Sequence, residues 1–239
     1  MFRSATYLIT AAVTCFASSA FAAQTAPQTF ILAPLTEPFQ SAFSFSQFNP
    51  TFGTLTGIEF SMATSESGSA TVTNATGSAG SYSYMSQSDL FVTDSLGNIF
   101  FNEALPTAAT QTGSQPPNSS RNLTASATAS AQTIFNGIGA GPYTLSSYTG
   151  TGSPSNPIDS TPFIGTGTVS LIFDGLDSST CTGTNVTCAT AASGGGTVTL
   201  IYDYTPATTA TPEPATVGLL GVALLALGLP KFRVMFRTL

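Results

Sequence analysis

Strict alternation of apolar and hydroxylated residues is the feature that most restricts the fold of this chain. In "TLTGIEFSM" the side chains of Ile58, Phe60 and Met62 fall on one face of an extended strand. Glu59 and Ser61 fall on the opposite face. A period of two residues is typical of a half-buried β-strand and does not produce the apolar stripe of a helix. The same alternation occurs in the segments "SAFSFSQF", "SATVTN", "SYSYM", "DLFVTD", "NIFF", "GTVSLIF" and "TVTLIYDYT".

Several short alternating segments, separated by Gly and Ser, predict an all-β fold of antiparallel strands. No helical period occurs between residues 24 and 205. We therefore expect an antiparallel β-sandwich over residues 23–205, in which two sheets pack face to face. The pattern leaves the choice between a jelly-roll and an Ig-like topology open. An open barrel or a β-solenoid is the alternative, although no fixed repeat length supports a solenoid.

Two stretches interrupt the alternation. Residues 102–121 and 148–162 concentrate Pro, Ser, Thr, Gly and Asn. Such composition is typical of turns and loops. We predict that both stretches are long surface loops.

The N-terminus has the pattern of a secretory signal peptide. Arg3 precedes an apolar stretch, and Ala20-Phe21-Ala22 forms a small-x-small site before Ala23. A membrane anchor would need about 20 apolar residues. We predict a signal helix over residues 1–22 with cleavage between Ala22 and Ala23.

The cysteine content agrees with export. Cys15 leaves with the signal, and Cys181 and Cys188 remain in the segment "CTGTNVTC". An even pair in an oxidising compartment predicts a disulfide that closes one hairpin or loop. Two thiolates in a chain without histidine supply only half of a tetrahedral zinc shell. We expect no metal centre at this pair and no bound cofactor.

The last alternating segment is followed by a linker and a charge-free segment. Residues 206–214 are rich in Pro and Thr and end in Pro212, Glu213 and Pro214. Such a linker is extended and weakly structured. Residues 215–229 carry no charge and, as a helix, are about 22 Å long, whereas the hydrocarbon core of a membrane is about 30 Å thick.

The basic residues of the tail complete a membrane-spanning pattern. Extension of the apolar run through Phe236 reaches spanning length, and Lys231, Arg233 and Arg237 lie in this final part. Basic residues stay on the cytoplasmic side of a membrane. We therefore predict a transmembrane helix over residues 215–239, with these three cations as a stop-transfer signal. A core helix or an amphipathic helix would need a polar face, which residues 215–229 lack.

The order of Pro-Glu-Pro triplet, apolar helix and basic end resembles the PEP-CTERM sorting signal of Gram-negative, biofilm-forming bacteria. The usual arginine run is diluted here to Lys231, Arg233 and Arg237. In the body, residues 47–62, the segment "GSATVTN" and residues 194–206 are similar to choice-of-anchor E exported domains. The resemblance implies a protein exported across the inner membrane and transiently anchored there. It further implies an exosortase that removes the tail near Pro212, Glu213 and Pro214, and delivery to the cell surface or extracellular matrix.

Charge and residue types exclude several function classes. Residues 23–211 contain ten carboxylates against Arg121, a formal charge of −9. A surface of that sign repels phosphate, so we expect no nucleic-acid partner. The chain has no histidine, and its one lysine, Lys231, lies in the tail, which excludes Ser-His-Asp, Cys-His and Ser-Lys catalysis. We predict that the protein is not an enzyme.

Catalysis by a pair of carboxyl groups is the remaining enzymatic possibility. A glycosidase needs two carboxyl groups about 5 to 9.5 Å apart. The acids here are scattered singly, mostly beside turns, so we expect solvated loop residues. The aspartates of "DSLGN" (94–98) and "DGLDSS" (174–179) fit either calcium ligands or ordinary Asp/Gly turns.

These observations together predict an exported structural or adhesive protein of the cell surface or matrix. The alternative is a carbohydrate-binding module of the exopolysaccharide matrix, because sugar rings stack on exposed aromatic side chains. The tyrosines available for such stacking are Tyr82, Tyr84, Tyr143, Tyr148, Tyr202 and Tyr204.

Overall fold

The computed structural model describes residues 22–104 and 108–207. Within these residues the chain is antiparallel β-structure with two short 3-10 turns, η1 (Pro50–Phe52) and η2 (Thr161–Phe163), which confirms the predicted all-β fold. No helix in this part of the chain is long and apolar enough to cross a membrane. The predicted signal helix, the Pro212–Pro214 triplet and the predicted transmembrane tail lie outside the described residues.

The strands are β1 (Ala23–Gln24), β2 (Gln28–Thr36), β3 (Phe39–Ser46), β4 (Gly53–Asn74), β5 (Gly80–Ser86), β6 (Ser88–Asp94), β7 (Ile99–Ala104), β8 (Ala108–Gln115), β9 (Ser119–Asn136), β10 (Pro142–Thr149), β11 (Ile158–Asp159), β12 (Thr168–Asp177), β13 (Thr180–Thr184) and β14 (Thr187–Pro206). They form a seven-stranded, a four-stranded and a three-stranded sheet.

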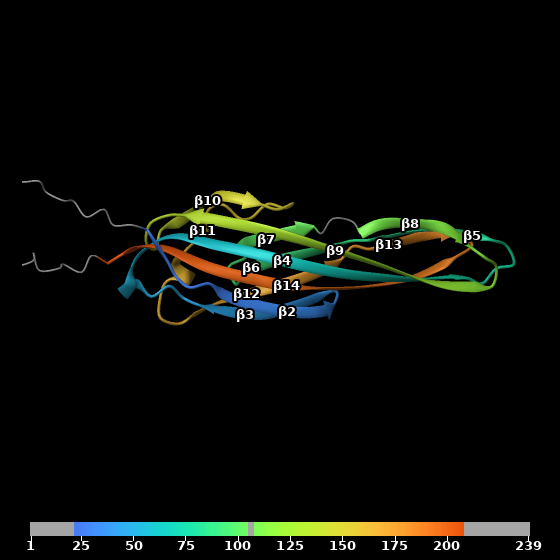
Figure 1. The fold of residues 1–239 in the computed structure, drawn as a ribbon, viewed down its shortest axis with the longest axis horizontal. Helices are drawn as coiled ribbons and strands as arrows, with labels where there is room; N and C mark the ends of the chain where they lie inside the picture. The colour runs from blue at the N-terminus through green and yellow to red at the C-terminus, as the bar shows by residue number, and fades with distance from the viewer. Residues whose placement is uncertain (1–21, 105–107, 208–239) are drawn as a thin grey trace, which may run out of the picture.

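The seven-stranded sheet runs along the whole length of the elongated molecule (Figure 1). Its order is β1-β14-β4-β9-β10-β11, and β2 also pairs with β14. The central strands β14, β4 and β9 contain 20, 22 and 18 residues. At about 3.3 Å per residue, β4 alone extends roughly 70 Å.

The two smaller sheets cover one face of the long sheet, end to end. The four-stranded sheet has the order β3-β12-β6-β7, and the three-stranded sheet has the order β13-β5-β8. Phe60 of β4 packs in a core cluster with Val92 and Phe173 of the four-stranded sheet. Val72, on the same face of β4, packs in a second cluster with Tyr84 of the three-stranded sheet. The arrangement is a sandwich with two separate apolar cores.

The covering layer is interrupted between its two sheets. β5 ends at Ser86 and β6 begins at Ser88, and β12 ends at Asp177 before β13 begins at Thr180. The two connecting segments are hydrogen-bonded to each other, because the Ser178 N–H donates to the Gln87 carbonyl at 3.0 Å. The break lies over the middle of β4.

Both ends of the described chain leave from one pole. Ala23 of β1 pairs with Tyr204 of β14, and the Ala207 N–H donates to the Phe52 carbonyl at 2.9 Å. The Cys181–Cys188 pair lies toward the opposite pole, where β5, β8 and β13 are found (Figure 1).

Several sequence-based strand predictions are confirmed, and two of the predicted segments merge. The segments "TLTGIEFSM" and "SATVTN" are parts of the single strand β4. The loop predicted over residues 102–121 is largely wrong, because residues 102–104 end β7, residues 108–115 form β8, which pairs with β5, and residues 119–121 begin β9. The sequence of β8, AATQTGSQ, has no large apolar side chains and therefore shows no apolar alternation. The loop predicted over residues 148–162 contains only the end of β10, the two-residue strand β11 and the start of η2.

Candidate functional site

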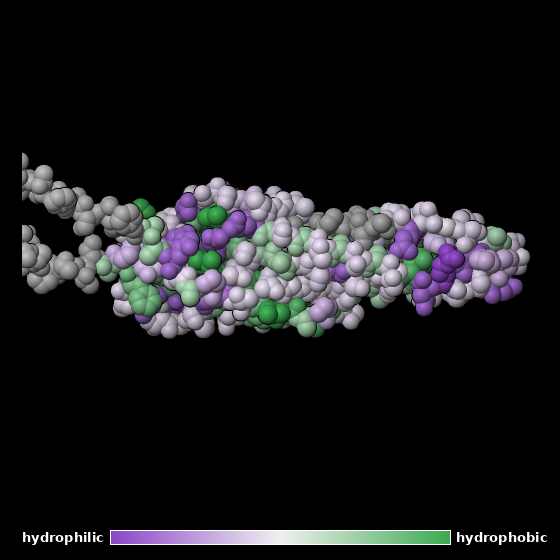
Figure 2. Space-filling view, viewed as in Figure 1, coloured by the Kyte–Doolittle hydropathy of each residue, from purple (hydrophilic) through white to green (hydrophobic). Residues whose placement is uncertain are grey.

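The outer face of the long sheet is a regular array of small uncharged side chains. Ser67 of β4 lies between Ser193 of β14 and Ser126 of β9 in the strand register. From Ser61 to Thr73, every outward position of β4 and its partners on both sides are uncharged, and most carry a hydroxyl group. Figure 2 shows a visible surface dominated by the middle of the hydropathy scale. Hydroxyl groups therefore hydrate this face without charge.

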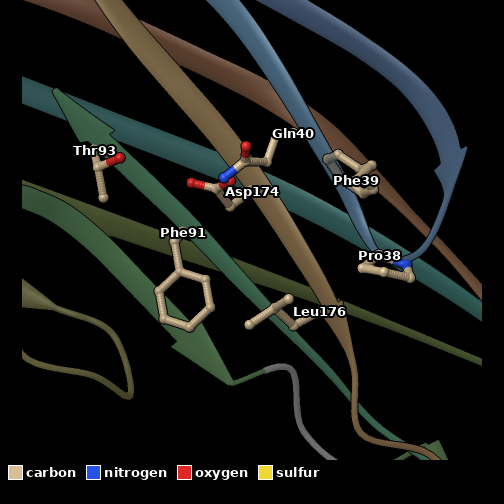
Figure 3. A pocket seen from close by; sticks show the side chains of 7 residues that line it. All are labelled: Pro38, Phe39, Gln40, Phe91, Thr93, Asp174 and Leu176. Atoms are coloured by element: carbon tan, nitrogen blue, oxygen red, sulfur yellow. The ribbon is translucent and has the colours of Figure 1, made fainter. Parts of the chain in front are cut away.

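The outer face of the four-stranded sheet carries a groove of about 620 Å³. Asp174 of β12 lies in register between Gln40 of β3 and Phe91 of β6. Figure 3 shows the polar ends of Gln40 and Asp174 side by side, whereas the Phe91 ring extends toward Leu176. The lining residues are Pro38, Phe39, Gln40, Phe91, Thr93, Asp174 and Leu176.

The groove contains none of the tyrosines that were predicted to stack on a sugar. Tyr84, Tyr143 and Tyr202 are fully buried, and Tyr82, two positions before Tyr84 on β5, is also buried. The predicted tyrosine platform is wrong for these four residues, because their rings fill the two apolar cores. Tyr148 and Tyr204 are half-buried.

Two acidic side chains are buried at the break in the covering layer. Glu66, in the middle of β4, is 2% exposed, and Glu37, between β2 and β3, is 8% exposed. The Ser86 hydroxyl donates to Glu66 Oε1 and the Ser88 hydroxyl donates to Glu37 Oε1, each at 2.5 Å. The prediction that the acids are solvated loop residues is therefore wrong for this pair, and it is also wrong for Asp94, which is 4% exposed. Sequence alternation does place Glu66 on the face of Met62, but it gives no sign of what covers that face.

The two carboxylates are neighbours across the strands. Gly194 of β14 lies opposite Glu66, and a Cβ atom at Gly194 would collide with Glu37 Oε1. Ser179, between β12 and β13, completes the cluster, because its hydroxyl lies 3.4 Å from the Ser86 hydroxyl. We call this set the polar waist; its members are Glu37, Glu66, Tyr84, Ser86, Ser88 and Ser179.

Burial dominates the electrostatics of the polar waist. Desolvation raises the pKa of Glu37 and of Glu66 above the usual carboxyl range, although a serine hydroxyl opposes the shift in each case. The nearby charges of Asp89 and Asp177 raise both pKa values further. Desolvation also raises the pKa of Tyr84, so its hydroxyl is neutral at physiological pH.

Three oxygen atoms of the polar waist have no hydrogen-bond partner among the residues that the structure describes. They are Oε2 of Glu37, Oε2 of Glu66 and the hydroxyl oxygen of Tyr84. Buried polar atoms nearly always form hydrogen bonds in native proteins, so each of these three unpaired oxygens requires an explanation.

Of the aspartates considered as calcium ligands, Asp94 and Asp177 stabilise turns, whereas Asp174 lies in β12 and lines the groove. Asp94 Oδ1 accepts from the backbone N–H groups of Leu96 and Asn98, both at 2.9 Å. Asp177 Oδ1 accepts from the Ser179 N–H at 2.8 Å. In residues 22–104 and 108–207, no group of three or more His, Cys, Asp or Glu side chains is arranged to hold a metal ion.

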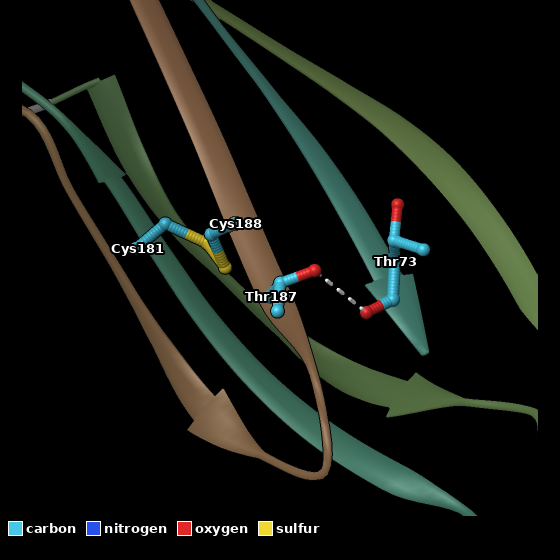
Figure 4. Close-up of a disulfide and its surroundings, with 4 residues drawn as sticks. All are labelled: Thr73, Cys181, Thr187 and Cys188. Carbon is cyan, nitrogen blue, oxygen red and sulfur yellow. Dashed lines mark hydrogen bonds between the residues drawn. A yellow bond between two sulfur atoms is a disulfide. The ribbon is translucent and has the colours of Figure 1, made fainter. Parts of the chain in front are cut away.

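The predicted cysteine pair joins β13 to β14 near the distal pole (Figure 4). The Cα atoms of Cys181 and Cys188 are 5.9 Å apart, and the sulfur atoms are bonded as a disulfide. Cys188 pairs with Val72 of β4, and Cys181 pairs with Tyr84 of β5. The bridge therefore links the long sheet to the three-stranded sheet through its β13 edge.

Comparison with known proteins gives little beyond this geometry. No protein-family model matches the chain, and no curated protein matches it. A chain in the structure of the infectious bursal disease virus Gx strain is 10% identical, with 77% of this chain and 37% of that chain covered, at a TM-score of 0.22. A chain of the T13 particle of the same virus is 11% identical, with 83% and 46% covered, at a TM-score of 0.16. This chain spans less than half the length of these viral chains, and at such TM-scores the matches carry no argument.

Proposed function

We propose that the chain is an exported structural or adhesive module of the cell surface or extracellular matrix. A sorting tail first anchors it in the inner membrane, and an exosortase-type protease is its processing partner. The structural role is supported by the position of the two chain ends. Both ends of the described domain leave from the pole where Ala23 pairs with Tyr204. A tether at that pole leaves a rod of roughly 70 Å, by the length of β4, to project from it.

Two further features support a role outside the cell. The outer face of the long sheet is hydrated by hydroxyl groups, which are insensitive to the salt concentration that screens charged surfaces. The Cys181–Cys188 bridge suits an oxidising compartment. Neither feature is a catalytic device, so they favour a structural role over an enzymatic one.

The sorting step is tested with the full chain in a host that carries an exosortase. Replacement of Pro212, Glu213 and Pro214 by alanine is expected to leave the full-length chain in the inner-membrane fraction. Replacement of Thr208, Thr209 and Thr211 by alanine is the matched control in the same linker and is expected to be processed like the wild type. Mass spectrometry of the C-terminus reads out removal of the tail. Equal persistence of the tail with and without the exosortase would contradict the proposal.

The groove around Asp174 favours a second candidate function, the binding of a neutral saccharide. A phenyl ring in the same groove as a carboxylate and an amide offers both a stacking face and hydrogen-bond partners for sugar hydroxyl groups. The acidic body disfavours anionic polysaccharides, because like charges repel.

This candidate is tested by pull-down of the purified chain with neutral and acidic polysaccharides. Saturable binding to a neutral glycan should be lost in Phe91→Ala and in Asp174→Asn. Leu96→Ala is the control, because Leu96 is 63% exposed but does not line the groove. Binding that survives both groove substitutions would exclude this site, and it would leave the sorting proposal untouched.

A further inference from the structure

We propose that the polar waist is a calcium site in which Glu37 and Glu66 provide the charged ligands. The site is independent of the sorting tail and of the saccharide groove. It lies where the four-stranded and three-stranded sheets meet over β4, so a bound ion would connect both parts of the covering layer to the long sheet.

The first argument is the missing counter-charge. Arg121 is the one basic residue among residues 22–104 and 108–207, and its guanidinium group donates to the Tyr82 hydroxyl at 2.9 Å. Within this part of the chain, therefore, no cationic side chain neutralises Glu37 and Glu66. Burial of an unpaired carboxylate is costly, and burial of two neighbouring carboxylates is more so.

The second argument comes from the orphaned atoms. Protons on the two Oε1 atoms would neutralise the pair and could be donated to the oxygens of Ser86 and Ser88, but both Oε2 atoms would still lack a donor. Neither Oε2 atom has a partner within hydrogen-bonding distance. A cation accepts lone pairs from several oxygens at once, so it would satisfy both Oε2 atoms together with the hydroxyl oxygen of Tyr84.

Tyr84 is the independent sign of a ligand. Its side chain is fully buried, and its hydroxyl oxygen has no hydrogen-bond partner of good geometry among the described residues, although Ser86 lies beside it. A Cβ atom at Gly68 would lie 2.7 Å from this hydroxyl and would collide with the Ser86 hydroxyl. Since Gly68 and Glu66 lie on the same face of β4, the Tyr84 hydroxyl is directed into the polar waist.

The donor set selects the type of ion. All the candidate ligands are oxygens: two carboxylates and the hydroxyl groups of Tyr84, Ser86, Ser88 and Ser179. Hard cations prefer oxygen ligands, and calcium accepts six to eight of them in irregular geometry. Magnesium demands near-ideal octahedral geometry and gives up its waters reluctantly, so it fits a dry strand-built site less well. Asp89 and Asp177, nearby, add negative potential that attracts a cation.

The experiment uses the full chain, purified in detergent and stripped of metal with EDTA. Calorimetric titration with CaCl₂ should show one saturable site per chain. Thermal unfolding, followed by far-ultraviolet circular dichroism, should shift upward by about 5 °C or more at calcium a hundredfold above its Kd. MgCl₂ at the same concentration should give a smaller shift.

Isosteric variants locate the site. Glu37→Gln and Glu66→Gln each keep an oxygen that can accept from serine but remove a charge. Each should weaken calcium binding about tenfold or more, since even loss of an outer-shell partner typically costs 10- to 100-fold. Tyr84→Phe should weaken binding without unfolding the chain, which keeps the test informative if a glutamine variant fails to fold. Asp203→Asn, at the pole where the chain ends leave and where the Asp203 carboxylate accepts from Gln24, is the matched acid control and should bind like the wild type.

Two results would overturn the proposal. In the first, titration of the wild-type chain with CaCl₂ gives no binding heat and no change in unfolding temperature, and the glutamine variants are at least as stable as the wild type. The two glutamates would then be neutralised by protons. The other is calcium binding that Glu37→Gln, Glu66→Gln and Tyr84→Phe all leave unchanged, because the ion then lies elsewhere.

Discussion

The hydroxyl group of Tyr84 lies above Gly68, at 2.7 Å from the position that a Cβ atom of residue 68 would take. The absence of a side chain at this one position of β4 leaves room for Tyr84 and Ser86 beside Glu66. Gly68 is therefore required by close approach, since its φ angle is that of an ordinary strand residue.

The close contact at Gly68 predicts different effects on stability for two matched Gly→Ala substitutions. Gly68→Ala should destabilise the domain by about 1–3 kcal/mol, because the new methyl group collides with the buried Ser86 hydroxyl. Gly77→Ala is the control, since a Cβ atom there would meet no atom within 4 Å. Urea unfolding, followed by circular dichroism, measures both. Equal stability of the two variants would show that the polar waist is loosely packed.

Two buried tyrosines should respond in opposite ways to loss of their hydroxyl groups. The Tyr143 hydroxyl is buried without a partner, so Tyr143→Phe should stabilise the domain by about 1 kcal/mol. The Tyr202 hydroxyl donates to the Ser46 carbonyl at 3.0 Å, so Tyr202→Phe should cost about 1 kcal/mol. Chemical denaturation at neutral pH tests both changes. A loss of stability in Tyr143→Phe would mean that its hydroxyl has a bonding partner in solution.

The difference in stability between Tyr143→Phe and the wild type should increase at alkaline pH. Burial raises the pKa of Tyr143 above its ordinary value of 10.0. The unfolded chain therefore ionises first, and the stability that is fully present below about pH 10 is lost as the pH rises toward the folded-state pKa. Each such tyrosine contributes up to about 1.4 kcal/mol per pH unit to the loss. Stability measured from pH 9 to pH 11 should fall less steeply in Tyr143→Phe; parallel curves would contradict the expectation.

Removal of the disulfide should loosen the distal pole. The bridge closes a short loop, because Cys181 and Cys188 are separated by seven positions. By the chain-entropy estimate, the double variant Cys181→Ser/Cys188→Ser should lose about 2.5 kcal/mol. Amide hydrogen exchange should accelerate in β13 and in the first residues of β14. Protection around Phe60, in the separate larger core, should change much less, and a uniform loss across the chain would argue against two cores.

Sequence alternation predicted the strands whose inner faces carry large apolar side chains. Phe43 and Phe45 mark β3, and Val169 and Leu171 mark β12, because each pair occupies alternate positions. It missed most of β9 and the first half of β14, where Ala, Ser, Thr and Gly occupy both faces. Small residues give almost no contrast between the two faces, so a strand that is held by its neighbours leaves little periodic signal.

The candidate sites were predicted less completely than the strands. The Cys181–Cys188 pair could be found from spacing, because only two cysteines remain after the predicted signal. Glu37 and Glu66 could not, because 29 positions separate them and the β2–β3 corner brings Glu37 over Gly194. The groove likewise requires three strands in register to place Gln40, Asp174 and Phe91 in one row.

The sequence by itself determined the class of the fold, since a period of two residues fixes which side chains lie on the same face of each strand. It also determined the acidic charge and the absence of histidine, and hence which chemistries the chain lacks. Only the tertiary structure decided which strands are neighbours, that β4 passes through two cores, and that two carboxylates meet between them. The physical reason is that alternation is a local property, whereas strand pairing and burial depend on residues that are distant in the chain.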